Sequence, residues 1–350
     1  MAPSLLRPTT QLSPEAALTL SQQAPTILRS SPSTVSSSAL NALFASSEKP
    51  ELWLQYENLI LACLRTGDER SAHQCLERLV ARFGPDNERV QALNGLVKEA
   101  EAKNNSELEA VLKEYDQILS ENDTNIPIAK RRIALLRSMG RLSDAASALV
   151  QLLGFSPTDA EAWSELSDVY LSQGLYPQAI YAMEEVLVLA PNAWNVCHPT
   201  TAIARDLSPM LMQPVQIHAR LGELHYMNAT APGAGSGSYQ KSMAEAIKRF
   251  SRSIELCDDY LRGYYGLKLV SQRVLRDPGK PPVRSGDSEF ALPDRSTIER
   301  LNELATAKLS EIVRRSTAQD RGWRGYSEAE IAAARELLSG DASASLAIKR

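Results

Sequence analysis

From about Pro50 to Leu275, apolar residues recur three and four positions apart, which is the spacing of the buried face of an amphipathic helix. In the first such stretch, one helical face carries six apolar residues before Gly67 and Asp68 end it: Leu52, Tyr56, Leu59, Ile60, Cys63 and Leu64. A second helix is predicted from Glu69 to Phe83, because Gly84 and Pro85 stop it. Almost nothing alternates as a strand would, so the pattern predicts an all-α fold.

The helical pattern also repeats with a period of 34 residues. Three landmarks of one unit return in the next, namely Gly140 and Gly174, Ala145 and Ala179, and Pro157 and Pro191. A unit of this length cannot bury its apolar face alone, so neighbouring units are expected to stack.

The unit that begins at Ala160 resembles a tetratricopeptide repeat. It places five residues at that repeat's spacing: Trp163, Leu166, Tyr170, Ala179 and Pro191. It departs from the pattern at Ser167, where a glycine or alanine is usual, and at Met183, where an aromatic is usual. The resemblance implies a right-handed superhelical solenoid of helix pairs, with these residues in its core.

The composition changes along the chain and suggests five segments. A Ser/Pro-rich arm is expected over residues 1–46, with a short helix from Pro14 to about Gln23 because Ser13 can cap it. The other predicted segments are the solenoid over 47–275, a linker over 276–295, C-terminal helices over 296–340 and a tail over 341–350.

Two stretches break the repeat register inside the solenoid. Residues 197–217 carry three prolines, and removing these 21 residues restores the phase of the following helix. The stretch is either a genuine surface loop or an intron translated in error, and a cDNA sequence across it distinguishes the two. The second stretch is a Gly/Ser-rich loop over 228–239, between the two helices of one unit.

Charge and cysteine content exclude several classes of protein. The 350 residues are 43% hydrophobic and carry 38 basic against 42 acidic side chains, so no global field favours nucleic acid. The four cysteines are widely spaced, which argues against a disulfide framework or a zinc knuckle: Cys63, Cys75, Cys197 and Cys257. No apolar run suits a signal peptide or a membrane span, so we expect a chain in the cytosol, with its Asn-X-Ser/Thr sequons unused.

Recognisable catalytic chemistry is missing from the sequence. No motif unites a nucleophile with a base, and we expect neither an enzyme nor a cofactor. His218 and His225 lie seven residues apart on one helical face, as a metal pair or, in the simpler interpretation, as packing residues. The basic run from Lys130 to Arg141 is either a solvated face or a contact for an acidic tail or lipid headgroups.

A solenoid of helix pairs typically binds a partner segment along its concave face, which the first helix of each pair lines. Register alone assigns ten candidates to that groove: Lys130, Arg137, Glu161, Ser164, Asp168, Leu171, Glu223, Tyr226, Arg262 and Tyr265. A clamp for a chaperone's C-terminal carboxylate needs a Lys and an Asn four residues apart on the concave helix. That pair is not evident, because Ala134 stands four residues after Lys130.

The joint order of several segments resembles subunit 2 of the endoplasmic reticulum membrane protein complex, in a fungal version. The resemblance covers about Glu48 to Leu275 and rests on ELWLQYENLILACLRTGDERSAHQCLERLVARFGPDNERVQAL, YDQILSENDTN, AEAWSELSDVYLSQGLYPQAIYAMEEVLVLAPNA and HARLGELHYM. It implies a non-enzymatic scaffold on the cytosolic face of that membrane, which cradles cytosolic segments of the membrane-embedded subunits. The complex inserts tail-anchored and some multipass proteins, and its membrane subunits would carry out insertion.

A second interpretation is a soluble co-chaperone or adaptor that binds peptide tails. Such a protein would stay soluble on fractionation, whereas a scaffold of the membrane complex would pellet with membranes and its integral proteins.

Overall fold

The structure is a computed structural model, and it describes residues 4–6, 13–30, 50–189, 214–233, 235–276, 292–318 and 326–348. These residues divide into two compact units, the first up to Pro157 and the second from Thr158. The secondary-structure elements of both units are helices, which confirms the predicted all-α fold.

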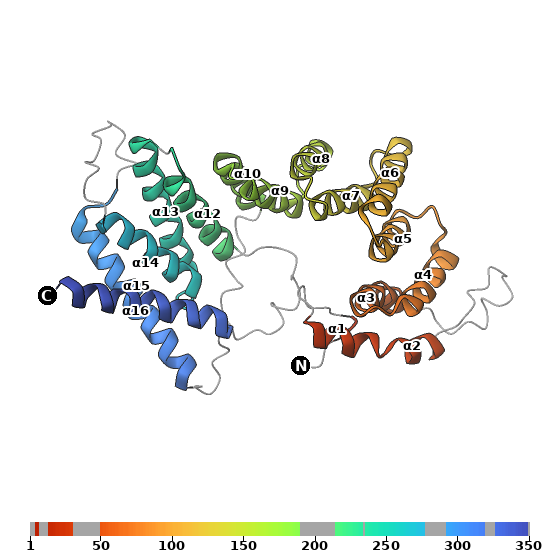
Figure 1. Cartoon of the computed structure of the whole chain (residues 1–350), viewed down its shortest axis with the longest axis horizontal. Coiled ribbons are helices and arrows are strands. Elements are labelled where there is room, and N and C mark those ends of the chain that lie inside the picture. The colour runs from red at the N-terminus through yellow and green to blue at the C-terminus, as the bar shows by residue number, and fades with distance from the viewer. Residues whose placement is uncertain are drawn as a thin grey trace. The chain divides into compact units, whose positions relative to one another are not determined.

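The first unit contains eight helices, coloured from red to green in Figure 1. They are α1 (Pro14–Ser21), α2 (Ala24–Ser30), α3 (Pro50–Thr66), α4 (Glu69–Phe83), α5 (Glu88–Glu101), α6 (Asn105–Glu121), α7 (Ile126–Ser138) and α8 (Leu142–Phe155). The second unit contains α9 (Ala160–Ser172), α10 (Tyr176–Leu189), α12 (Pro214–Thr230), α13 (Ser236–Leu256), α14 (Leu261–Arg276), α15 (Arg295–Ala318) and α16 (Glu328–Ile348).

The helix ends follow from local chemistry. The predicted helix from Glu69 to Phe83 is confirmed as α4: the Asp68 carboxylate accepts a hydrogen bond from Ser71 N at 3.2 Å, and Gly84 ends it with φ of 86°. Gly140 and Gly174, one period apart, both take a left-handed conformation, with φ of 75° and 73°. A residue with a side chain rarely adopts that conformation, which explains why glycine recurs there.

Residues one period apart also touch. The Asn122 side chain donates to Glu88 Oε1 at 3.1 Å, and Asn125, which caps α7, donates to Gln91 Oε1 at 2.9 Å. Each bond spans 34 residues, so successive repeats place equivalent helices α5 and α7 side by side.

The departures from the repeat pattern are accommodated in the core of the second unit. Ser167 is buried and donates its hydroxyl to Ala179 O at 2.8 Å, so a polar atom at the helix crossing is satisfied. Met183 is also buried, and its flexible side chain fills the place of an aromatic.

A further close packing point joins three helices of the second unit. The Phe250 ring of α13 lies against Gly222 of α12 and Gly266 of α14. A Cβ atom at Gly266 would lie 2.1 Å from Phe250 Cε1, and one at Gly222 would lie 2.9 Å from the ring. No side chain fits at these two positions unless the ring moves.

The short helix predicted from Pro14 to about Gln23 is present as α1, but the N-terminal arm holds more structure than the sequence predicted. α2 follows α1, and Leu5, Leu20 and Leu28 are buried in the same core cluster as α3 and α4. Asn58 Nδ2 donates to Leu5 O at 2.7 Å, and Arg78 donates to Leu28 O at 2.6 Å. A composition rich in Ser and Pro hid these few apolar contacts, which cap the first repeat.

Three predicted boundaries also need correction. α12 already begins at Pro214, since proline suits the first position of a helix, so residues 214–217 are helical and Ile217 is fully buried. Deletion of all 21 residues as an intron would therefore remove part of the core, while residues 197–213 lie outside the described residues. The Gly/Ser loop spans 231–235, and it is shorter than the predicted 228–239 because α12 and α13 extend into it.

The C-terminal helices continue the core of the second unit. Leu309 and Ile312 of α15 and Ile331 of α16 belong to the same apolar cluster as Phe250. Tyr326 donates its hydroxyl to Asp259 O and accepts a bond from Leu261 N at 3.0 Å, which ties the start of α16 to α14. α16 extends to Ile348, so the predicted helix end near Gly340 is wrong.

The packing of the N-terminal helices predicts that alanine substitutions at two leucines of α1 differ sharply in their effect on stability. Leu20 is 1% exposed and Leu18 is 51% exposed. We expect Leu20→Ala to lower the free energy of unfolding of the first unit by about 2–5 kcal/mol, because it leaves a cavity, and Leu18→Ala to change it by less than about 0.5 kcal/mol. Chemical denaturation of both variants measures this, and equal small effects would show that α1 does not belong to the folded unit.

Candidate protein-interaction surface

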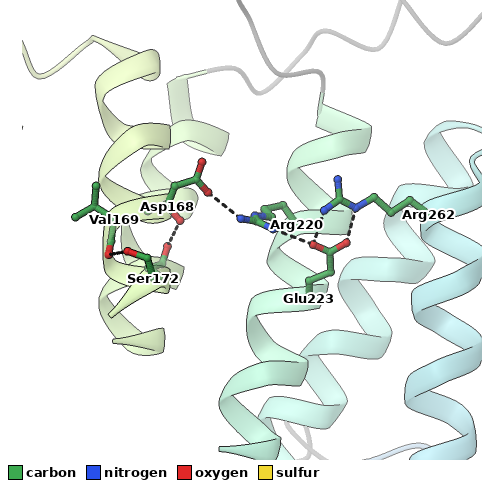
Figure 2. A network of polar contacts seen from close by, with 8 residues as sticks. Asp168, Val169, Ser172, Arg220, Glu223 and Arg262 are labelled. Atoms are coloured by element: carbon green, nitrogen blue, oxygen red, sulfur yellow. Dashed lines mark hydrogen bonds and ion pairs between the residues drawn. The ribbon is translucent and has the colours of Figure 1, made fainter. Parts of the chain in front are cut away.

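Three first helices of successive pairs in the second unit, α9, α12 and α14, carry a continuous row of charged side chains (Figure 2). Asp168 lies on α9, Arg220 and Glu223 on α12, and Arg262 on α14; we call these four residues the polar row. The start of α9 is fixed by its N-cap, where the Asp159 carboxylate accepts a hydrogen bond from Ala162 N at 3.0 Å.

The polar row is joined by direct ion pairs. Arg220 Nη2 lies 2.8 Å from Asp168 Oδ1, and Arg220 Nη1 lies 3.3 Å from Glu223 Oε2. Glu223 then accepts two bonds from Arg262, from Nε and, at 2.7 Å, from Nη2 (Figure 2). Charges alternate along the row, so it links three helices without accumulating one sign.

The side chains at the two ends of the polar row are more exposed to solvent than the two in its middle. The side chains of Arg220 and Glu223 are each 21% exposed, whereas Asp168 is 45% and Arg262 is 51% exposed. The hydrogen bonds from Arg262 to Glu223 raise the pKa of the guanidinium, and burial opposes this. Solvent therefore still reaches the charges at the two ends of the row, which weakens their ion pairs.

Register predicted three members of the row, Asp168, Glu223 and Arg262, and the structure brings these three together through Arg220. Sequence reasoning missed Arg220 because its partner Asp168 lies 52 residues earlier in the chain. The available signal was its spacing of three residues from Glu223, which suits an ion pair within one helix turn.

The other predicted groove residues of the second unit lie on the same three helices, α9, α12 and α14. Glu161 is exposed and Ser164 half-buried on α9. Leu171 packs against the α9–α12 core, while Tyr226 and Tyr265 pack against the core of α12–α16. These last three residues each combine a packing role with a partly open surface.

The basic run in the first unit is largely neutralised by ion pairs. Arg131 binds both oxygens of Glu99, which also accepts the Tyr115 hydroxyl at 2.5 Å, and Arg132 Nε lies 2.6 Å from Asp116 Oδ1. Burial, followed by the bond to Glu99, raises the pKa of Tyr115. The two predicted groove residues here are Lys130, half-buried, and Arg137, exposed, both on α7.

The histidine pair of α12 occupies a packed interface. His218 Nδ1 and His225 Nε2 are buried without a hydrogen-bond partner, and burial lowers the pKa of each ring to about 4. Among the described residues, no group of three His, Cys, Asp or Glu side chains could hold a metal ion. Cys63 and Cys75 are buried thiols whose pKa is raised by burial to about 12.

Comparison with known proteins adds the family to this geometry. Residues 76–210 match the model of the EMC2 TPR-like repeat domain. Over 265 residues the chain is 31% identical to TPR repeat protein oca3 of Schizosaccharomyces pombe, covering 74% of this chain and 82% of oca3. It is 34% identical to ER membrane protein complex subunit 2-A of Xenopus laevis over 268 residues, covering 76% of this chain and 78% of that protein. The chain belongs to the ER membrane protein complex subunit 2 family.

Membership of this family confirms the resemblance seen in the sequence and the tetratricopeptide-type solenoid of helix pairs. A more distant relative, ER membrane protein complex subunit 2 of Saccharomyces cerevisiae, is 24% identical over 57% of this chain and 54% of its own length. As for membrane spans, none of the helices in the described ranges is long and apolar enough to qualify.

The ion pairs of the polar row predict that the charge of Glu223 contributes to the stability of the second unit. Glu223→Gln leaves Arg220 and Arg262 without their shared carboxylate, so we expect a loss of about 1 kcal/mol in the free energy of unfolding, smaller at high salt. Glu255→Gln, which breaks only the exposed pair with Arg252, is the matched control and is expected to change it by less than about 0.5 kcal/mol. Urea denaturation at two salt concentrations compares the variants, and equal effects would contradict a structural row.

The half-buried histidines of α12 predict a loss of stability in mild acid. Each ring takes up a proton near pH 6.5 when unfolded but only near pH 4 when folded, so stability falls as the pH is lowered from 6.5 toward 4. The slope is at most about 1.4 kcal/mol per pH unit for each histidine. The charges that also shift the pKa of the two rings lie on α13, and they are Lys241, Glu245, Arg249, Arg252 and Glu255.

The double variant His218→Gln/His225→Gln isolates this effect. Its free energy of unfolding should depend less steeply on pH between 6.5 and 5 than that of the unaltered chain. An identical slope in the two proteins would show that neither ring resists protonation.

Proposed function

We propose that this chain is a non-enzymatic scaffold subunit of the ER membrane protein complex. The observation that carries the proposal is the similarity to ER membrane protein complex subunit 2-A, which extends over 76% of this chain and 78% of that relative. A match across most of both chains supports the same place in an assembly, since each repeat contributes surface to a solenoid's partners.

The scaffold lies on the cytosolic face of the endoplasmic reticulum membrane and is held there by other subunits. Its groove cradles cytosolic segments of the integral subunits, and the groove residues are the ten that register assigns. In this way it supports insertion of tail-anchored and multipass proteins, while the integral subunits handle the substrate. The chain itself supplies neither catalysis nor a cofactor.

The chemistry of the surface supports a protein ligand with mixed charge. The polar row presents the carboxylate of Asp168 at one end and the guanidinium of Arg262 at the other, with Tyr226 and Tyr265 partly open beside it. Alternating charges and half-buried aromatics suit a polar segment that carries some apolar residues.

Fractionation and gentle purification test the proposal. We expect the tagged full-length chain to pellet with endoplasmic reticulum membranes, to be released by alkaline carbonate, and to co-purify in mild detergent with integral proteins in equal amounts. Recovery from the soluble fraction with chaperones alone would contradict the proposal and favour the co-chaperone interpretation.

Charge reversal identifies the groove within that complex. Glu161→Arg/Arg262→Glu changes two exposed groove positions and should reduce co-purification of integral proteins several-fold. Arg252→Glu, on the exposed face of the second helix α13, is the control and should leave recovery unchanged. Unchanged recovery with both variants would place the interface elsewhere.

A further inference from the structure

A pocket of about 230 Å³ opens in the first unit where α6, α7 and α8 meet. Its apolar lining comes from all three helices: Leu119, Ala129, Ile133, Ala148, Leu152 and Phe155. Small-molecule sites usually measure roughly 300–1,000 Å³, so this volume suits a single large side chain better than a cofactor.

The rim of the pocket leaves apolar surface open to solvent. Phe155, which lines the pocket, is 45% exposed. Within the described part of the chain, nothing covers the exposed part of its ring. An exposed aromatic beside a pocket of this size is typical of a site for an apolar anchor from a partner.

The electrostatic surroundings are negative. Asp116 and Asp123 both line the pocket; Asp116 pairs with Arg132, whereas no described residue forms an ion pair with Asp123. The carboxyl ends of two helices also reach the pocket, because α6 ends at Glu121 and α8 at Phe155. Neither helix has a basic residue in its last turn, so their negative dipole ends are not compensated there.

Two positive contributions oppose these. Arg132 also lines the pocket, where its charge is offset by the pair with Asp116, and the amino end of α7 lies near the pocket, since Ala129 is in its first turn. Two negative helix ends and the Asp123 carboxylate outweigh that single amino end. The pocket therefore favours an apolar group that carries a cation close to it.

We propose that this pocket is a docking site for a partner segment that inserts one large apolar side chain and places a Lys or Arg beside Asp123. The occupant is a cytosolic segment of an integral membrane subunit that adjoins a membrane span. Such segments are rich in Lys and Arg next to apolar sequence, as the site requires. This assignment of the partner rests on the proposed function, and the pocket lies apart from the polar row in the sequence, on α6–α8.

Site-specific photo-crosslinking in the purified membrane complex tests the docking site. p-Benzoylphenylalanine replaces Gln151, which lines the pocket and is exposed, in the full-length chain. The same group at Ser147, exposed on α8 outside the lining, is the control. We expect position 151, and not 147, to crosslink to a cytosolic segment of an integral subunit, at an apolar residue within about one helical turn of a Lys or Arg.

Charge reversal then tests the cation. Asp123→Lys should reduce the yield of that crosslink by roughly fivefold or more, because it repels the basic residue. Asp86→Lys makes the same charge change at an exposed position away from the pocket and should leave the yield unchanged. Thermal denaturation of both variants verifies that the first unit remains folded.

The outcomes separate this inference from the proposed function. If the chain co-purifies with integral proteins but position 151 crosslinks to nothing, to a second copy, to its own chain or to a segment without basic residues, the docking site is wrong and the scaffold stands. Equal yields with Asp123→Lys and Asp86→Lys would overturn the role of the cation. A chain that co-purifies with no integral protein overturns both proposals.

Discussion

The close approach of neighbouring helices is the constraint on which the rest of the structure depends. Phe250 fills the space above Gly222 and Gly266, and Tyr115 lies so close to Gly95 that a Cβ there would meet the Tyr115 hydroxyl at 2.2 Å. Because a large ring on one helix requires a missing side chain on the next, packing fixes where each helix lies along its neighbour. The polar row and the pocket of the first unit follow from that arrangement, since they occupy faces that helix packing leaves open.

Ion pairs between helices have a secondary role in both units. Some of them join first helices of successive pairs, as Glu99 with Arg131 and Glu223 with Arg262 show, but most involve at least one side chain that solvent reaches. Pairs of this kind add little to stability. They do neutralise surfaces that the sequence alone would classify as basic or acidic. These surfaces therefore carry charges of both signs.

The sequence predicts the parts of the fold that depend on local chemistry. The 34-residue period placed Gly140 and Gly174 correctly because both require a left-handed backbone, and α4 was bounded correctly by Asp68 and Gly84. The N-terminal helices were underestimated because their stability comes from contacts with α3 and α4 rather than from their own composition. Arg220 was missed for a related reason: its importance depends on a partner 52 residues away.

The capped N-terminus has a consequence for the order in which the chain folds. The bonds from Asn122 and Asn125 to α5 span 34 residues, whereas the bonds that hold Leu5 and Leu28 span 53 and 50 residues. During synthesis the N-terminal segment therefore leaves the ribosome before the surface that binds it exists, and loop closure over that distance must come later. The first residues to be made must therefore wait for α3 and α4 before they can dock.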